Sequence, residues 1–220
     1  MKRSAPSTAG PKPARKPRGR PRAFDREAAL AAAMEVFWAK GFESTSISDL
    51  TQAMGINPPS LYSAFGDKEK LFLEAMERYS DRNRNACPYG DEPTARGAVE
   101  KMLTYAAHEF TEASEHPRGC LMMMASTTAA NGSEAMRKWI AQRRNSARDH
   151  LRARIRRGIE EGDVPAEADA TALTDFYFTI LTGMALQSRE GASRKSVLAT
   201  VAQAMSLFPK AQKKKLAAAA

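Results

Sequence analysis

Residues 45–70 constrain the fold of this chain more than any other stretch, because they carry the start and stop signals of two short helices. Ser46 and Asp49 have the spacing of a capping box, in which two side chains satisfy backbone amides at a helix N-terminus. Gly55 stands where a left-handed, helix-ending residue belongs. Asn57 can cap a second helix that begins at the following proline. Two short helices joined by a tight turn with glycine are typical of a helix-turn-helix.

The residues on both sides of this motif extend the pattern into a family resemblance. The run from Phe24 to Met76 resembles helices 1 to 4 of the DNA-binding domain of the TetR family of transcriptional regulators. The matching pieces are AKGFESTSISDL, the GIN turn, SLYSAF and GDKEKLF. The resemblance implies an all-α, TetR-like fold of about nine helices. It would have an N-terminal three-helix helix-turn-helix domain and a larger C-terminal domain for ligand binding and dimerisation.

The composition agrees with an all-helical, globular chain. Of the 220 residues, 43% are hydrophobic and 27% are charged, and Leu, Ala and Met outnumber β-branched residues, which favours helices. No window approaches eighteen consecutive apolar residues, so no membrane span is expected. The basic N-terminus lacks the apolar core of a signal peptide. By resemblance, we expect a cytoplasmic bacterial protein associated with the nucleoid.

Composition shifts along the chain predict four segments. A basic segment without large apolar groups precedes the motif, and the loop ACPYGDEP marks a composition break after the fourth helix. We expect a disordered basic arm at 1–22, a helix-turn-helix domain at 23–68, a ligand-binding and dimerisation domain at 69–209, and a disordered tail at 210–220.

The net charge of +9 is concentrated at the two ends of the chain. The arm carries eight basic residues and no acid, and the tail carries four lysines. These charges exceed the net charge, so the folded body is mildly acidic. A DNA-facing surface must therefore be a local basic patch rather than the whole protein.

Within the arm, the segment PRGRPR resembles the core of an AT-hook. Its arginines are Arg18, Arg20 and Arg22. Glycine permits close backbone approach, proline keeps the chain extended, and a narrow minor groove attracts arginine. We expect minor-groove contact, and the alternative is a solvated basic tail that adds only non-specific attraction to phosphates.

The second helix of the motif should enter the major groove through its N-terminal residues. The candidate base-contacting residues are Asn57, Pro58, Pro59, Ser60 and Ser63. TetR-family members often have a Lys-Gly pair where this chain has Pro58 and Pro59, so a charged group and two amide donors are missing. The readout should shift toward apolar contact with thymine methyl groups and hydrogen bonds from asparagine and serine.

Phosphate contacts are expected around the motif, by resemblance and because hydroxyls and helix N-termini suit phosphate oxygens. The candidates are Thr45, Ser46, Tyr62 and Lys68. For Tyr62, the alternative is partial packing in the core. Double-stranded DNA is thus the first expected partner.

The C-terminal half offers apolar residues for a ligand pocket and a dimer interface. Family members commonly bind a small-molecule effector between helices 4 and 8, and the possible lining includes Met102, Tyr105, Phe110, Met123, Trp139 and Phe176. Each of these residues is individually a candidate for the core instead.

The last two predicted helices, near 166–188 and 194–208, resemble those that form a four-helix dimer interface in the family. The first is apolar round much of its circumference, so it should be covered on two sides. The expected contacts with the partner subunit are Phe178, Leu181, Ala185, Val197, Val201 and Met205. The alternative is a monomer that folds both helices into one core.

No catalytic or metal-binding constellation is visible, so we expect no enzyme activity, no cofactor and no metal. Cys120 is the one candidate nucleophile, with Arg118 nearby to favour a thiolate. A buried, inert cysteine is the alternative. The expected function is a ligand-responsive repressor that binds a palindromic operator as a homodimer. The alternatives are a regulator that senses oxidants or electrophiles through cysteine and a nucleoid-type DNA binder.

Overall fold

The secondary structure is helical throughout the residues that the structure describes, which are 24–114, 116–128 and 132–210 of a computed structural model. The expected all-α fold is confirmed, with nine α-helices and no strand in these ranges. The helices are α1 (Arg26–Lys40), α2 (Ile47–Met54), α3 (Pro58–Phe65), α4 (Lys68–Ala86), α5 (Ala95–Thr111), α6 (Leu121–Thr128), α7 (Glu134–Glu161), α8 (Ala170–Arg189) and α9 (Arg194–Ser206), with a short 3-10 helix η1 at Tyr89–Asp91.

Local signals set the boundaries of α2 and α3, as the sequence predicts. Ser46 and Asp49 form both hydrogen bonds of a capping box at the start of α2. Gly55 ends α2 with a φ of 63°, in the left-handed region that favours glycine. The Asn57 side chain accepts a hydrogen bond from the Ser60 amide, 2.9 Å away, and so caps α3.

Helices α1 to α4 pack around an apolar centre that fixes the position of α3. Phe37 of α1 and Phe72 of α4 meet edge to face, with ring centroids 5.1 Å apart. Leu61 and Phe65, one helical turn apart on α3, are both buried against this centre. The opposite face of α3 is left for solvent.

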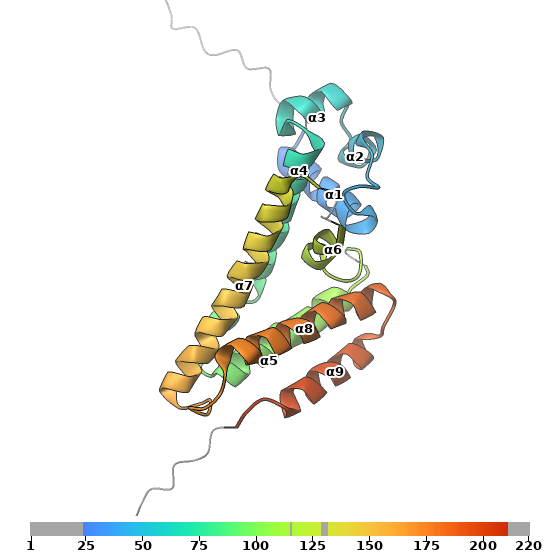
Figure 1. Cartoon of the computed structure of the whole chain (residues 1–220). Coiled ribbons are helices and arrows are strands. Elements are labelled where there is room, and N and C mark those ends of the chain that lie inside the picture. The colour runs from blue at the N-terminus through green and yellow to red at the C-terminus, as the bar shows by residue number, and fades with distance from the viewer. Residues whose placement is uncertain (1–23, 115, 129–131, 211–220) are drawn as a thin grey trace, which may run out of the picture.

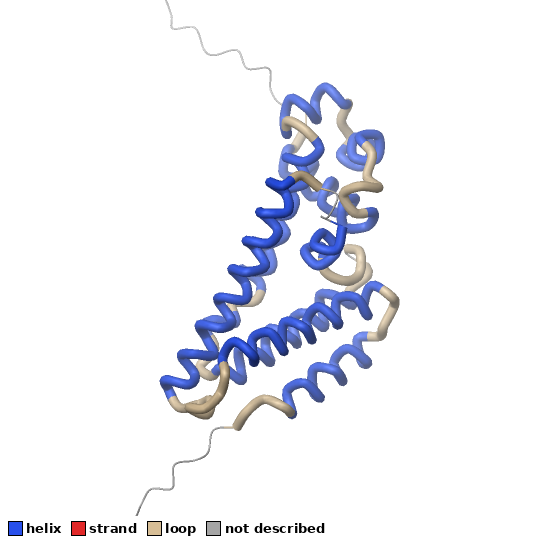
Figure 2. The backbone as a smooth tube through the Cα atoms, viewed as in Figure 1, coloured by secondary structure: helices blue, strands red, loops and turns tan. Residues whose placement is uncertain are grey.

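The remaining helices form a second, larger layer (Figure 1). Helices α5, α8 and α9 pack against one another, and α7 packs on both α5 and α8. Figure 2 shows the long α7 running from the region of α1–α3 to the far end of the molecule. Helix α8 begins four residues later than the sequence suggests, because the Asp169 side chain caps it.

A buried aromatic contact joins the α1–α3 head to the body. Trp38 of α1 stacks on His116, with ring centroids 4.4 Å apart, and meets Tyr79 of α4 edge to face. His116 Nε2 lies 3.2 Å from Glu109 Oε1 of α5. The head therefore contacts α4 and the body through the same cluster of rings.

Candidate nucleic-acid interface and ligand cavity

Helix α3 presents its N-terminal half to solvent at the end of the molecule farthest from α9 (Figure 1). Asn57, Pro58, Pro59 and Ser63 are exposed, and Ser60 is half-buried. The structure thus brings together all five residues for which base contacts are predicted. The base contacts themselves stay predictions.

The N-terminus of α3 has no amide left to offer a phosphate. Proline has no backbone N–H, which removes two donors at Pro58 and Pro59. The Ser60 amide donates to Asn57 Oδ1 at 2.9 Å, and the Leu61 amide donates to the Asn57 carbonyl at 3.1 Å. An anion site of the usual kind at a helix N-terminus is therefore closed here. Recognition must rest on side chains.

Two of the predicted phosphate-contacting residues remain available on this surface. Tyr62 is 48% exposed, which favours an outward role over the alternative of core packing. Lys68 is half-buried, with its ammonium 4.5 Å from the centroid of the Phe42 ring. That cation–π contact fixes Lys68 at the start of α4, beside the end of α3.

The structure corrects the assignment of Thr45. Its side chain is only 1% exposed, and its hydroxyl donates to the Gly41 carbonyl at 2.6 Å. This hydroxyl holds the turn between α1 and α2 and is not presented to a phosphate. Ser46 is exposed, but its hydroxyl donates to Asp49 Oδ2 at 2.8 Å within the capping box. The predicted contacts of Arg18, Arg20 and Arg22 lie outside the described residues.

A cavity of about 610 Å³ lies between α4, α5, α7 and α8. This volume is within the usual range for small-molecule sites. Four predicted pocket residues line it, together with Phe178, Met122, Leu181 and Cys120, which were predicted for the lining, the dimer interface or redox chemistry. The four are Met102, Tyr105, Phe110 and Met123.

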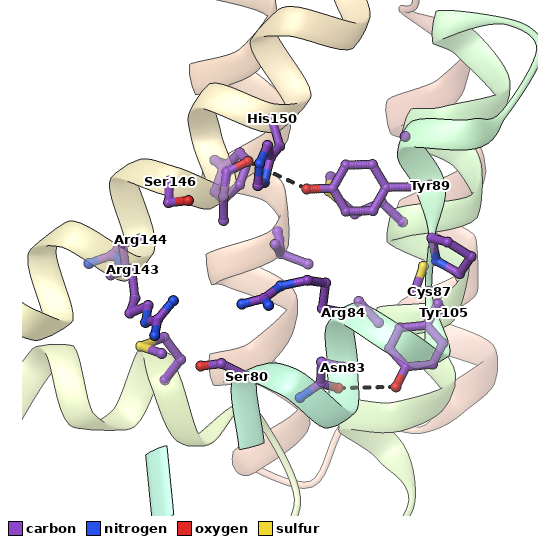
Figure 3. Close-up of a pocket in the computed structure, with 18 of the residues that line it drawn as sticks. Ser80, Asn83, Arg84, Cys87, Tyr89, Tyr105, Arg143, Arg144, Ser146 and His150 are labelled. Carbon is purple, nitrogen blue, oxygen red and sulfur yellow. Dashed lines mark hydrogen bonds between the residues drawn. The ribbon is translucent and has the colours of Figure 1, made fainter. Parts of the chain in front are cut away.

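Polar groups of α4 and α7, which sequence reasoning missed, also line this cavity (Figure 3). Tyr105 donates to Asn83 Oδ1 at 3.0 Å, and Tyr89 donates to the Ala147 carbonyl at 3.4 Å. Burial raises the pKa of both phenols to about 12, so they are neutral hydrogen-bonding groups. The available signal was the spacing of His150 and the α7 arginines at three- and four-residue steps, which puts them on one helix face.

Two predicted lining residues lie elsewhere. Trp139 of α7 is half-buried against the core, and the Arg143 guanidinium lies 5.2 Å from its ring centroid. Phe176 of α8 is 38% exposed and packs edge to face on Tyr177. Both were assigned to the pocket from their size and apolar character, which do not say which helix face a residue occupies.

Cys120 lines the cavity but lacks the setting of a reactive thiol. It is 6% exposed, and burial raises the pKa of its thiol. Tyr79 Oη donates to Cys120 Sγ at 3.2 Å. The Arg118 guanidinium, expected to favour a thiolate, donates instead to the Ala192 carbonyl. The geometry favours the inert alternative over a redox-sensing cysteine.

The predicted dimer contacts also need correction. Five of the six side chains are at most 5% exposed in the single chain, because α8 and α9 turn these faces toward α5 and the body core. The five are Phe178, Ala185, Val197, Val201 and Met205, and the sixth, Leu181, is half-buried at the cavity. The outward side of α8 carries Phe176, Thr179, Gly183 and Leu186 instead.

The described residues hold neither a metal-binding cluster nor a membrane-spanning helix. No group of three or more His, Cys, Asp or Glu residues in these ranges is placed to hold a metal ion. No helix in the same part of the chain has the length and apolar character to cross a membrane.

A head with an exposed recognition helix, joined through α4 to a body with a cavity, defines a helix-turn-helix regulator. Known proteins agree with this class. Residues 29–75 match the family described as "Bacterial regulatory proteins, tetR family", and residues 99–205 match "Tetracyclin repressor-like, C-terminal domain". The chain belongs to the TetR family, and it is a DNA-binding transcriptional regulator.

Similar proteins include two repressors from Escherichia coli K12. The HTH-type transcriptional repressor ComR is 33% identical over 198 residues, which cover 89% of this chain and 94% of ComR. The repressor BdcR is 32% identical over 186 residues, covering 84% of this chain and 90% of BdcR. Among solved structures, a cysteine mutant of the TetR-family regulator CifR in complex with 26-bp operator DNA is 42% identical. The match has a TM-score of 0.81 and covers 87% of this chain and all of that one.

Proposed function

We propose that this chain is a ligand-responsive repressor that binds an inverted-repeat operator as a homodimer, in the bacterial cytoplasm on the nucleoid. The observation that carries the proposal is α3, which is anchored by Leu61 and Phe65 and exposes its N-terminal half. Two such heads related by a twofold axis would read half-sites about 34–36 Å apart, or somewhat more. The names of ComR and BdcR, both repressors, support the direction of regulation.

Base recognition would come from the side chains of α3. Pro58 and Pro59 offer apolar surface to thymine methyl groups. Asn57 uses its Oδ1 for the cap, and its Nδ2 has no hydrogen-bond partner among the described residues, so the amide can donate to a base. Tyr62 and Lys68 would contact phosphates. The arm, residues 1–22, would add minor-groove contacts through its arginines.

The exposed faces of α8 and α9 would form the dimer interface. Phe176 and Leu186 are 38% and 55% exposed on one side of α8, separated by Thr179 and Gly183, which allow close approach of a second helix. Helix α9 presents small exposed residues, Ala199 and Ala202 among them. Four such helices, two from each chain, would bury both faces.

The dimer assignment can be tested by sedimentation. Leu186→Asp should convert the dimer to a folded monomer, because it places a charge in a buried apolar contact. Ala141→Asp, at an exposed position of α7, is the matched control and should stay dimeric. A dimer that survives Leu186→Asp would contradict this interface.

The cavity would hold the effector and act on the head through α4. Tyr79 lines the cavity and also meets Trp38 of α1, with ring centroids 5.0 Å apart. A ligand that moves α4 therefore moves the head contact directly. The effector needs different affinities for the DNA-bound and free forms, and a coupling of about 1–3 kcal/mol would change operator affinity roughly 5- to 150-fold.

Binding-site selection from random duplex DNA tests the proposed function for an operator of any sequence. The proposal predicts enrichment of one inverted repeat. Cleavage protection of genomic DNA upstream of enriched sites would then locate the operator. Recovery of unrelated sequences without a consensus would contradict sequence-specific regulation and favour a nucleoid-type binder.

A further inference from the structure

The wall of the cavity is rich in arginine and poor in acids. Besides its apolar residues, it contains His150 and a single carboxylate, Asp91. Its five arginines come from α4 and α7 and are Arg84, Arg143, Arg144, Arg154 and Arg157. How these five guanidinium groups are paired decides what charge a ligand would meet.

Four of the five arginines already have a carboxylate partner. Arg143 pairs with Glu77, and Arg84 lies 3.1 Å from Asp81 of its own helix. Glu161 is a shared partner, 3.1 Å from Arg157 and 3.6 Å from Arg154. The charges of these four arginines are largely compensated within the chain.

Arg144 is the exception, since no carboxylate pairs with it among the described residues. It is half-buried, and its Nε is buried without a hydrogen-bond partner. Burial and then the neighbouring Arg148 lower the pKa of Arg144. A guanidinium that is partly desolvated and next to a second cation is destabilised until an anion approaches it.

The other end of the cavity is apolar. Phe110 of α5 and Phe178 of α8 contribute rings, and flexible methionine side chains fill the space between them. The apolar lining also includes Met102, Ala106, Met122, Met123 and Leu181. A ligand that satisfied Arg144 alone would leave this apolar surface uncovered.

We propose that the effector is an organic anion with an apolar body, whose carboxylate pairs with Arg144. The proposal rests on the assignment of this cavity as the effector site. Guanidinium and carboxylate match in a two-bond geometry, so one arginine can hold the head group. Figure 3 shows Arg84 reaching into the cavity from α4, and its exposed pair with Asp81 is weak enough to rearrange around an anion. Such a ligand would bridge α7 and α4, the helix that continues to the head.

Calorimetric titration of the full chain with three probes tests this class of ligand. Decanoate, 1-decanol and decylamine have the same alkyl body and differ in head-group charge. We expect decanoate to bind about tenfold or more tightly than decanol, the magnitude of a charged hydrogen bond, and decylamine to bind most weakly. Arg144→Gln should remove the advantage of decanoate and leave decanol binding unchanged, and Arg144→Lys should restore part of it.

Arg156→Gln is the matched control, since Arg156 lies exposed on the same helix outside the cavity lining. Operator binding by ligand-free Arg144→Gln should equal that of this control, which shows that the variant is folded. Equal affinities for decanoate and decanol, tighter binding of decylamine, or no binding of any probe would each overturn the anion assignment. Operator binding would persist in all three cases, so the proposed DNA-binding function is judged separately.

Discussion

Replacing Asn57 with alanine tests how the recognition helix is held and how it reads DNA. In the structure, Asn57 Oδ1 accepts from the Ser60 amide at 2.9 Å, and Pro58 and Pro59 supply no amide hydrogens. The Ser60 amide is thus the one donor in the first three positions of α3, and only the Asn57 side chain holds it. Asn57→Ala should release that donor and loosen the start of α3.

The expected cost is the value of one helix cap, about 1 kcal/mol within a range of about 0.5–2 kcal/mol. For a protein of this size that corresponds to a fall of about 2–4 °C in Tm per kcal/mol. If the Asn57 amide also contacts a base, operator affinity should fall by a further 1–3 kcal/mol or so, roughly 5- to 150-fold. Thermal unfolding measures the first effect, and anisotropy titration of operator DNA measures the second.

Asn57→Ser separates the two roles, because serine caps a helix well but lacks the amide. It should keep Tm near the wild-type value while losing affinity for the operator and not for scrambled DNA. An unchanged Tm in Asn57→Ala would refute the capping argument. Wild-type operator affinity in Asn57→Ser would refute the base contact.

Single contacts elsewhere in the chain give three more expected outcomes. Tyr62→Phe should weaken operator and scrambled DNA alike, by about 0.5–1.5 kcal/mol in anisotropy titrations, and a selective loss would contradict a phosphate contact. Gly158→Ala should destabilise the chain to denaturant by about 1–3 kcal/mol, since an added Cβ would lie 2.7 Å from Ala95 Cβ. Wild-type stability would refute that packing. Hydrogen bonds, first from the Ser114 amide, lower the pKa of Glu112 from 4.5 to about 2. Its ionised form therefore stabilises the fold above about pH 4.5, and this is lost toward pH 2. Glu112→Gln should lower Tm at neutral pH, and the difference should shrink as pH falls; a constant difference would contradict this assignment.

The helix-turn-helix could be predicted from sequence because its boundaries are set locally. The capping box of Ser46, the left-handed Gly55 and the Asn57 cap each depend on residues within four positions, and each is confirmed. Burial of Leu61 and Phe65 follows from their spacing on one helix face. The local signals and the hydrophobic period agree in this segment.

The faces of α8 could not be assigned in the same way. Phe178 and Ala185 were expected at a partner subunit and lie in the core, whereas Phe176 was expected in the pocket and lies outside. A helix that is apolar round most of its circumference has no period that marks its inner side. Only the packing of α5, α7 and α9 around it decides which residues are covered.

Individual polar roles were equally hard to predict. The Thr45 hydroxyl bonds to the Gly41 carbonyl, so a residue that suits a phosphate contact by type holds a turn instead. Arg144 was one of many arginines on α7, whose charged face was expected to be solvated. It differs from its neighbours in lacking a carboxylate partner among the described residues, and pairing between distant helices is not encoded in local spacing.

The most direct test of sequence-specific regulation is an anisotropy titration with DNA from upstream of the protein's own gene. Scrambled DNA is the control, and both titrations are run at two salt concentrations, with and without residues 1–22. Sequence-specific regulation predicts tighter binding to the upstream DNA by about 10³-fold or more at physiological salt. Removing the arm should lower affinity and salt dependence while this discrimination survives. Equal binding to both DNAs by the shortened chain, lost as salt rises, would contradict recognition through α3.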